Sequence, residues 1–155
     1  MAEAIGRHDY AQTLRTRHEL AKADWNAAYV NPSNGKTRSL AGKTVHTQAS
    51  YATPLNFNVF SDANRALAEK HLADLVMNPA ASGQTAEELA AENGGTAVDS
   101  NMQGVLGSGN TDFNFKPYTI TTGFSGTPNI LPALSRGGYG DVAYRLFDVF
   151  LLRYV

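Results

Sequence analysis

Apolar residues along this chain recur at the spacing of an amphipathic helix rather than with the strict alternation of a strand. The first such segment runs from Tyr10 to Val30, and the residues that fall near one face of it are Leu14, Ala21, Trp25, Ala28 and Tyr29. Asp9 stands where an N-cap is expected, and Gln12 follows at the position that completes a capping box. The run Asn31-Pro32-Ser33-Asn34-Gly35 has strong turn chemistry, so we expect the helix to end there.

The same periodicity predicts two more helices in the middle of the chain. One runs from Thr47 to about Phe57 and contains Pro54, at which we expect a kink. The next begins after Ser61, which is placed as its N-cap, and ends at Asn78-Pro79. Its apolar stripe consists of Leu67, Ala68, Leu72, Leu75 and Val76.

The last part of the chain predicts a final pair of helices. One spans Thr122 to about Ser135, and its residues Pro128 and Pro132 require a late start, a bend or a local irregularity. The other runs from Asp141 to the end, with the stripe Val142, Leu146, Phe147 and Phe150. The fold class is therefore all-α, built from helical hairpins with long connections and no βαβ alternation. We expect a core that includes Leu14, Trp25, Leu67, Leu72, Leu75, Leu134 and Leu146.

Residues 80–117 break this pattern because they are rich in glycine and asparagine and poor in apolar residues. A short helix is predicted from Thr85 to Glu92, where a T-x-x-E capping box is followed by Asn93-Gly94-Gly95. Ordering each backbone residue costs about 1–2 kcal/mol, and this stretch has little apolar surface to offset that cost. We expect a loop-rich insertion in a domain that otherwise spans residues 1–155.

Composition and charge exclude several classes of function. The chain has 155 residues, 13 Lys plus Arg, 14 Asp plus Glu and a net charge of −1, which argues against a nucleic-acid partner. The sequence contains no apolar run long enough to predict a membrane span. No secretory signal is visible either, so the localisation stays unknown. The absence of cysteine excludes a disulfide framework and thiolate zinc sites.

The titratable residues do not form a recognisable catalytic or metal-binding pattern. The histidines are His8, His18, His46 and His71, and their spacing matches no metal-ligand motif, so we expect neither metal nor cofactor. His18 and His71 lie among charged neighbours in amphipathic helices and are expected at the solvated surface. His46 lies at a helix start, where Thr and Gln are more often caps than ligand contacts. No two carboxylates are placed by spacing to act as acid and base, so no catalytic residue is named.

Three segments, considered together, resemble a known family. They run from Ala23 to Thr37, from Thr44 to Ser61 and from Thr119 to Phe147. The third is the most specific, because it contains T-T-G-F-S-G-T-P and D-V-A-Y-R-L-F. In order and content they resemble the catalytic domain of bacterial α-L-rhamnosidases, glycoside hydrolase family 78.

The resemblance implies a six-hairpin (α/α)₆ toroid with a carbohydrate bound in a cleft at one end, of which this chain is a portion. Family members hydrolyse terminal α-L-rhamnosides with inversion, which needs a general acid and a general base. The family motifs that supply these carboxylates have no counterpart here, so the chain is expected to be inactive alone. Gln48, Thr122 and Phe124 lie in matched motifs at helix starts and are the candidates for substrate binding. The alternative is that they cap helices and pack the hairpins.

A different class of function stays open beside this one. The chain is then a non-catalytic helical scaffold or a carbohydrate-binding remnant. Under either interpretation an incomplete toroid leaves helix faces uncovered, and large apolar patches favour association. We therefore expect partial exposure of the last stripe and self-association through it, the residues being Val142, Leu146, Phe147, Phe150 and Leu151.

Overall fold

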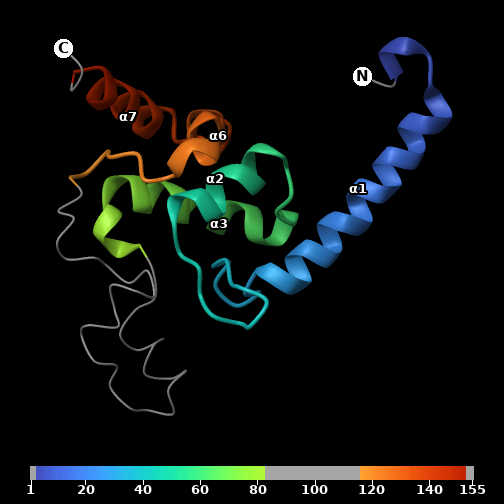
Figure 1. Cartoon of the computed structure of the whole chain (residues 1–155), viewed down its shortest axis with the longest axis horizontal. Helices are drawn as coiled ribbons and strands as arrows, with labels where there is room; N and C mark the ends of the chain where they lie inside the picture. Colours follow the sequence, from blue (N-terminus) through green and yellow to red (C-terminus); the bar gives the residue numbers. More distant parts are fainter. Residues whose placement is uncertain (1–2, 83–115, 153–155) are drawn as a thin grey trace.

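The structure is a computed structural model that describes residues 3–82 and 116–152. The elements are η1 (Glu3–Ile5), α1 (His8–Tyr29), α2 (Gln48–Asn56), α3 (Asp62–Met77), η2 (Pro79–Ala81), α6 (Gly123–Arg136) and α7 (Gly140–Leu152) (Figure 1). Within these ranges there is no strand, and β-type pairing is limited to isolated bridges in the connection after α1. The all-α prediction is confirmed for this part of the chain. The helix predicted from Thr85 to Glu92 lies outside the described residues.

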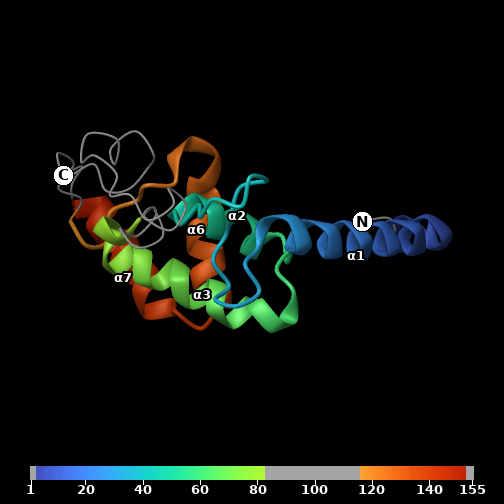
Figure 2. The same cartoon turned by 90° about the horizontal axis from the view of Figure 1, so that it is seen from below.

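Four helices pack together and enclose the core. Helix α2 lies between α3 and α6, and α7 packs against both α6 and α3 (Figures 1 and 2). The predicted core residues Leu72, Leu75, Leu134 and Leu146 are buried, which confirms that part of the periodicity argument. Each such side chain contributes about 1.5–3 kcal/mol when removed from water. The other large side chains of the core are Tyr51, Phe60 and Ile130.

Helix α1 projects away from this body, and only its last turns contact it (Figures 1 and 2). Asn26 Nδ2 donates to the Val59 carbonyl at 2.7 Å, and Asn26 Oδ1 accepts from the Ser61 N–H at 2.9 Å. The Trp25 ring meets the Phe60 ring edge-on, with centroids 5.2 Å apart. These contacts hold the C-terminal end of α1 against the loop between α2 and α3.

Three predicted core residues are therefore placed differently. Leu14 is 42% exposed because the body does not reach the middle of α1, and Trp25 is only partly buried. Leu67 is 41% exposed because its side of α3 is covered by the turn at Gly35 and not by another helix. Each helix has an apolar stripe, but a residue of the stripe is buried only where a neighbouring element covers it.

The predicted exposure of the last helix is wrong at Val142 and Leu146. Their exposed fractions are 4% and 0%, because α7 lies across α6 and α3 and buries this face. Phe147 is exposed, as expected. The side chains of Phe150 and Leu151 lie outside the described set.

The helix starts follow the sequence in part. The prediction of Asp9 as an N-cap is wrong, since α1 begins at His8 and Asp9 lies in its first turn. A carboxylate there still interacts favourably with the helix dipole. The helix predicted from Thr47 begins at Gln48, with Thr47 as its N-cap and a capping box completed by the Ser50 side chain. Ser61 occupies the N-cap position of α3, although its side chain makes no capping hydrogen bond.

The prolines are accommodated inside the helices. Helix α6 begins directly after Thr122 and continues through Pro128 and Pro132 to Arg136, so it does not start late. A proline has no N–H, so the carbonyls of Phe124 and Pro128 lose their usual helical donors. Helix α2 ends two residues after Pro54, where the chain turns toward α3.

Replacing Gly35 with alanine is expected to destabilise the fold strongly. Its φ is +68°, and an added Cβ would lie 2.7 Å from Leu67 Cβ. The left-handed backbone alone costs an alanine about 1–2 kcal/mol, and the steric clash adds to this. Gly42 is the matched control, because its φ is +83° and its Cβ position is open. Urea unfolding of Gly35→Ala and Gly42→Ala should show the larger loss for Gly35→Ala; equal losses would contradict the contact with Leu67.

Glu69 gives a pH dependence of known sign. Burial raises the pKa of its carboxyl, and the nearby Arg65 only partly offsets this. The folded state therefore binds the carboxyl proton more tightly than the unfolded state does. Burying the ionised carboxylate lowers the free energy of unfolding, and this loss is absent at low pH and grows as pH rises through the carboxyl's titration. Unfolding free energies of Glu69→Gln and wild type should diverge from pH 3 to pH 7 in favour of the variant, by less than about 1 kcal/mol at this partly exposed site. A gap that widens toward acid would contradict this.

Candidate functional site

The N-terminal ends of α2 and α6 meet, and the side chain of Gln48 joins them. Gln48 Oε1 accepts from the Thr121 N–H at 2.8 Å. Its Nε2 donates to the Leu75 carbonyl at 3.1 Å and to the Thr119 carbonyl at 2.9 Å. The residue is fully buried. Gln48 thus links the start of α2, the last turns of α3 and the segment that leads into α6.

Thr122 lies beside this junction and is also buried. Its Oγ1 lies 3.1 Å from Thr127 Oγ1, inside the first turns of α6. Gly126 leaves the space for it, since a Cβ at Gly126 would lie 2.6 Å from Thr122 Cβ. The hydroxyl of Thr122 is therefore engaged within its own helix start.

Unlike Gln48 and Thr122, Phe124 has a fully exposed side chain. It projects from the first turn of α6, one residue after Gly123, whose φ is +67°. The structure thus brings Gln48 and Thr122 into one buried junction and leaves Phe124 as the aromatic surface beside it. An exposed aromatic ring at this place offers an apolar face to a ligand.

A polar ladder between α2 and α6 was not predicted. Asn56 Nδ2 donates to Asn129 Oδ1 at 2.6 Å, and Asn129 Nδ2 donates to Thr53 Oγ1 at 3.4 Å. The Arg136 guanidinium donates to both oxygens of Asn56. Asn129 is buried. These bonds fix the axial position of α6 against α2.

A cluster formed by the buried rings of His46 and Tyr51 and the half-buried ring of His71 was also not predicted. His46 Nδ1 lies 2.7 Å from Tyr51 Oη, which accepts a longer bond of 3.4 Å from the Thr37 N–H. The His46 and His71 rings are perpendicular with centroids 5.2 Å apart, and His71 Nε2 lies 2.8 Å from the Asn34 carbonyl. The predicted solvated position of His71 is wrong because the turn after α1 covers it. The cluster attaches that connection to α2 and α3.

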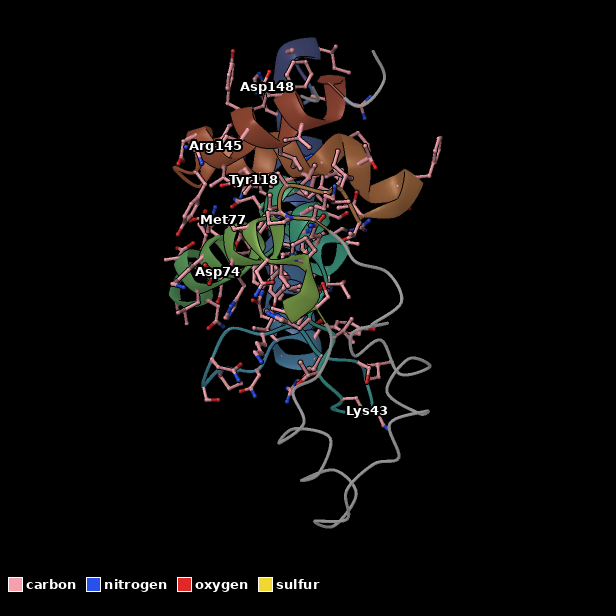
Figure 3. The ribbon with its side chains drawn as sticks, turned by 90° about the vertical axis from the view of Figure 1, so that its left-hand side faces the viewer. Lys43, Asp74, Met77, Tyr118, Arg145 and Asp148 are labelled. Carbon is pink, nitrogen blue, oxygen red and sulfur yellow. The ribbon has the colours of Figure 1, made fainter. Side chains whose placement is uncertain are left out.

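The face formed by α3 and α7 contains Tyr118, the residue that leads into the junction (Figure 3). Its N–H donates to the Val76 carbonyl at 2.7 Å, and its φ is +61°. The Arg145 guanidinium lies 5.9 Å from the Tyr118 ring centroid. A cation over an aromatic ring contributes about 0.5–1 kcal/mol at an exposed site. This contact ties α7 to the segment that Gln48 holds.

An open groove lies on the other side of α2, between α2, the end of α1 and the connection that joins them. Its volume is about 490 Å³. The lining residues are Trp25, Tyr29, Thr37, Arg38, Ser39, Val45, Ser50, Thr53, Pro54, Phe57 and Val59. The signal in the sequence was the aromatic pair Trp25 and Tyr29, at i and i+4 on the apolar face of the first helix, of which Trp25 was assigned to the core.

The ion pairs found for the described carboxylates lie at the surface. They join Glu3 to Arg15, Glu19 to His18, Asp62 to Lys22 and Arg65, and Asp74 to Lys70. Such pairs contribute about 0–1 kcal/mol. Over residues 3–82 and 116–152, no group of three or more histidines and carboxylates is placed to hold a metal ion. Across the same ranges, no helix combines the length and the apolar character needed to cross a bilayer.

Replacing Gln48 is expected to disturb the junction far more than replacing Phe124. In Gln48→Ala the Thr121 N–H and the Thr119 carbonyl lose their buried partner, and each unsatisfied group costs about 1–3 kcal/mol. Phe124→Ala removes a fully exposed ring, and such changes alter stability by about 0.5 kcal/mol or less. Denaturant unfolding of both variants measures the difference. Similar values for the two would contradict the linking role of Gln48.

Comparisons with known proteins found no match for this chain among protein-family models, curated proteins or solved structures.

Proposed function

We propose that this chain forms neighbouring hairpins of an (α/α)₆ glycosidase domain of the α-L-rhamnosidase type. The parent protein then hydrolyses terminal α-L-rhamnosides with inversion. The observation that carries the proposal is the junction at Gln48. Two of the three segments that resemble the family, one beginning at Thr44 and the other at Thr119, meet there through hydrogen bonds.

The packing of the helices supports a repeating hairpin arrangement. Helices α2 and α3 form one hairpin, and α6 and α7 form the next. The first helices of the two hairpins contact each other, and so do the second helices. Repetition of this relation about an axis generates an inner and an outer ring of helices, which is the architecture of the proposed toroid.

The proposed sugar site lies at the N-terminal ends of α2 and α6. Phe124 supplies an exposed ring for the apolar face of a deoxy sugar, and the first turns of a helix carry backbone N–H groups without helical partners. Gln48 and Thr122 act as positioning residues, because their polar atoms are engaged within the protein. This site binds and orients a sugar and transfers no proton.

The catalytic carboxylates are assigned to other hairpins of the parent. Inversion needs two carboxyl groups about 6.5–9.5 Å apart, with water between one of them and the sugar. The acids that pair with Arg15, Lys22 and Lys70 lie on solvated helix faces away from the junction. Asp112, an acid of the insertion, lies outside the described residues.

The purified chain should release no p-nitrophenol from p-nitrophenyl α-L-rhamnoside above the blank. Each missing acid or base normally contributes about 10²- to 10⁴-fold, so the loss of both leaves almost nothing. The protein encoded by the complete reading frame should cleave the same substrate and release β-L-rhamnose first, as NMR of the initial product shows. In that protein Phe124→Ala should raise KM, while an exposed control, Leu40→Ala, should not.

Turnover of p-nitrophenyl α-L-rhamnoside by the chain alone would contradict the assignment of the carboxylates to other hairpins. If the complete protein does not hydrolyse α-L-rhamnosides, or hydrolyses them with retention of the anomeric configuration, the family assignment is wrong.

The second candidate is a non-catalytic carbohydrate-binding or scaffold protein. Two observations favour it. The Phe124 ring is exposed beside the helix starts, and no carboxylate is found at the junction among the described residues. In that case the complete protein binds L-rhamnose without cleaving its glycosides. Self-association belongs to the same proposal, and the exposed residues Tyr10, Leu14 and Leu20 of α1 are its proposed contact surface.

A further inference from the structure

The groove between α1 and α2 has aromatic walls of fixed orientation. The Trp25 ring is held edge-on by Phe60 and lies 5.9 Å from the Tyr29 ring at 37°. Phe57 lines the groove from the end of α2 and is 62% exposed. Pre-positioned rings of this kind bind flat apolar groups with little loss of side-chain entropy.

Arg38 gives the groove a positive charge, and it is the one charged residue of the lining. Its Nε and Nη2 donate to the carbonyls of Ala28 and Ala27 at 3.2 and 2.7 Å. These bonds hold the guanidinium at the rim. Among the described residues, no carboxylate pairs with Arg38 and no acceptor engages its Nη1. An anion at the rim would complement this charge.

The hydroxyls of Thr37, Ser50 and Thr53 in the lining are already engaged, which argues against a sugar. Thr37 Oγ1 lies 2.7 Å from Ser50 Oγ, and Ser50 Oγ donates to the Val45 carbonyl at 2.8 Å. Thr53 Oγ1 accepts from Asn129. A sugar in the groove would bury several hydroxyls without partners, each at a cost of about 1–3 kcal/mol.

The size of the groove favours a small molecule over a protein segment. A volume of about 490 Å³ lies within the range of ligand pockets, which is about 300–1,000 Å³. We propose that this groove binds an aromatic carboxylate of one or two rings. The ring lies against Trp25, Tyr29 and Phe57, and the carboxylate accepts from Arg38 Nη1. This site is separate from the proposed sugar site at Gln48 and does not depend on it.

Trp25 is the chain's one tryptophan, so its indole N–H resonance reports on the groove without further assignment. We would titrate the full chain with 2-naphthoate and, as the uncharged matched probe, 2-naphthamide, following this resonance by NMR. Saturable shifts are expected with both, and the carboxylate should bind about tenfold more tightly because its hydrogen bond to Arg38 is charge-assisted. L-rhamnose should leave the resonance unmoved.

Two variants separate the ring contacts from the charge. Phe57→Ala should weaken both probes equally, whereas Arg38→Gln should remove the preference for naphthoate and leave the binding of naphthamide. Arg38→Lys keeps the charge and should keep part of the preference for naphthoate. This variant distinguishes the loss of the charge from the loss of the hydrogen bonds to the Ala27 and Ala28 carbonyls. Tyr144→Ala on α7, which removes an exposed ring outside both proposed sites, is the control and should change neither affinity.

Equal affinities for naphthoate and naphthamide in the wild-type chain would overturn the role of Arg38 and with it the proposal. Shifts that do not saturate, or a shift of the Trp25 resonance by L-rhamnose that competes with naphthoate, would overturn it as well.

Discussion

The side-chain amide of Gln48 is the contact on which the arrangement of the packed helices depends. A glutamine amide offers both an acceptor and donors, and here the acceptor binds the backbone N–H of Thr121 while the donors bind the carbonyls of Leu75 and Thr119. In a buried place these backbone groups have no water to replace the amide. The path of the chain into α6 is therefore set by a residue more than seventy positions earlier.

The two sides of α2 serve different purposes. Toward α6, asparagine side chains and Arg136 form a ladder that fixes the register of the hairpins. Toward α1, aromatic side chains leave an open groove in which the hydroxyls of Thr37, Ser50 and Thr53 are already engaged. The proposed sugar site lies near the helix starts, whereas the proposed site for an aromatic acid is the groove. The two proposals therefore concern separate surfaces.

Helical periodicity predicted the described helices to within a few residues, because the apolar stripe and the turn residues are local properties of the sequence. It placed Leu72 and Leu134 correctly but not Leu14 or Val142, since burial depends on which neighbour covers a stripe. Gln48, Thr122 and Phe124 were noticed through the family resemblance. The groove, the Asn129 ladder and the ring cluster at His71 depend on pairs distant in sequence, which no local pattern encodes.

The projection of α1 has a consequence for how the molecule unfolds. In the first half of this helix every residue but Ala11 is exposed, Tyr10 and Leu14 included, so tertiary contacts contribute little there. Isolated helices shorter than about 12–15 residues are marginal in water. The outer turns of α1 therefore open and close as a local event, independent of the core around Leu75. Amide protection is therefore expected to increase along α1 from His8 to Asn26.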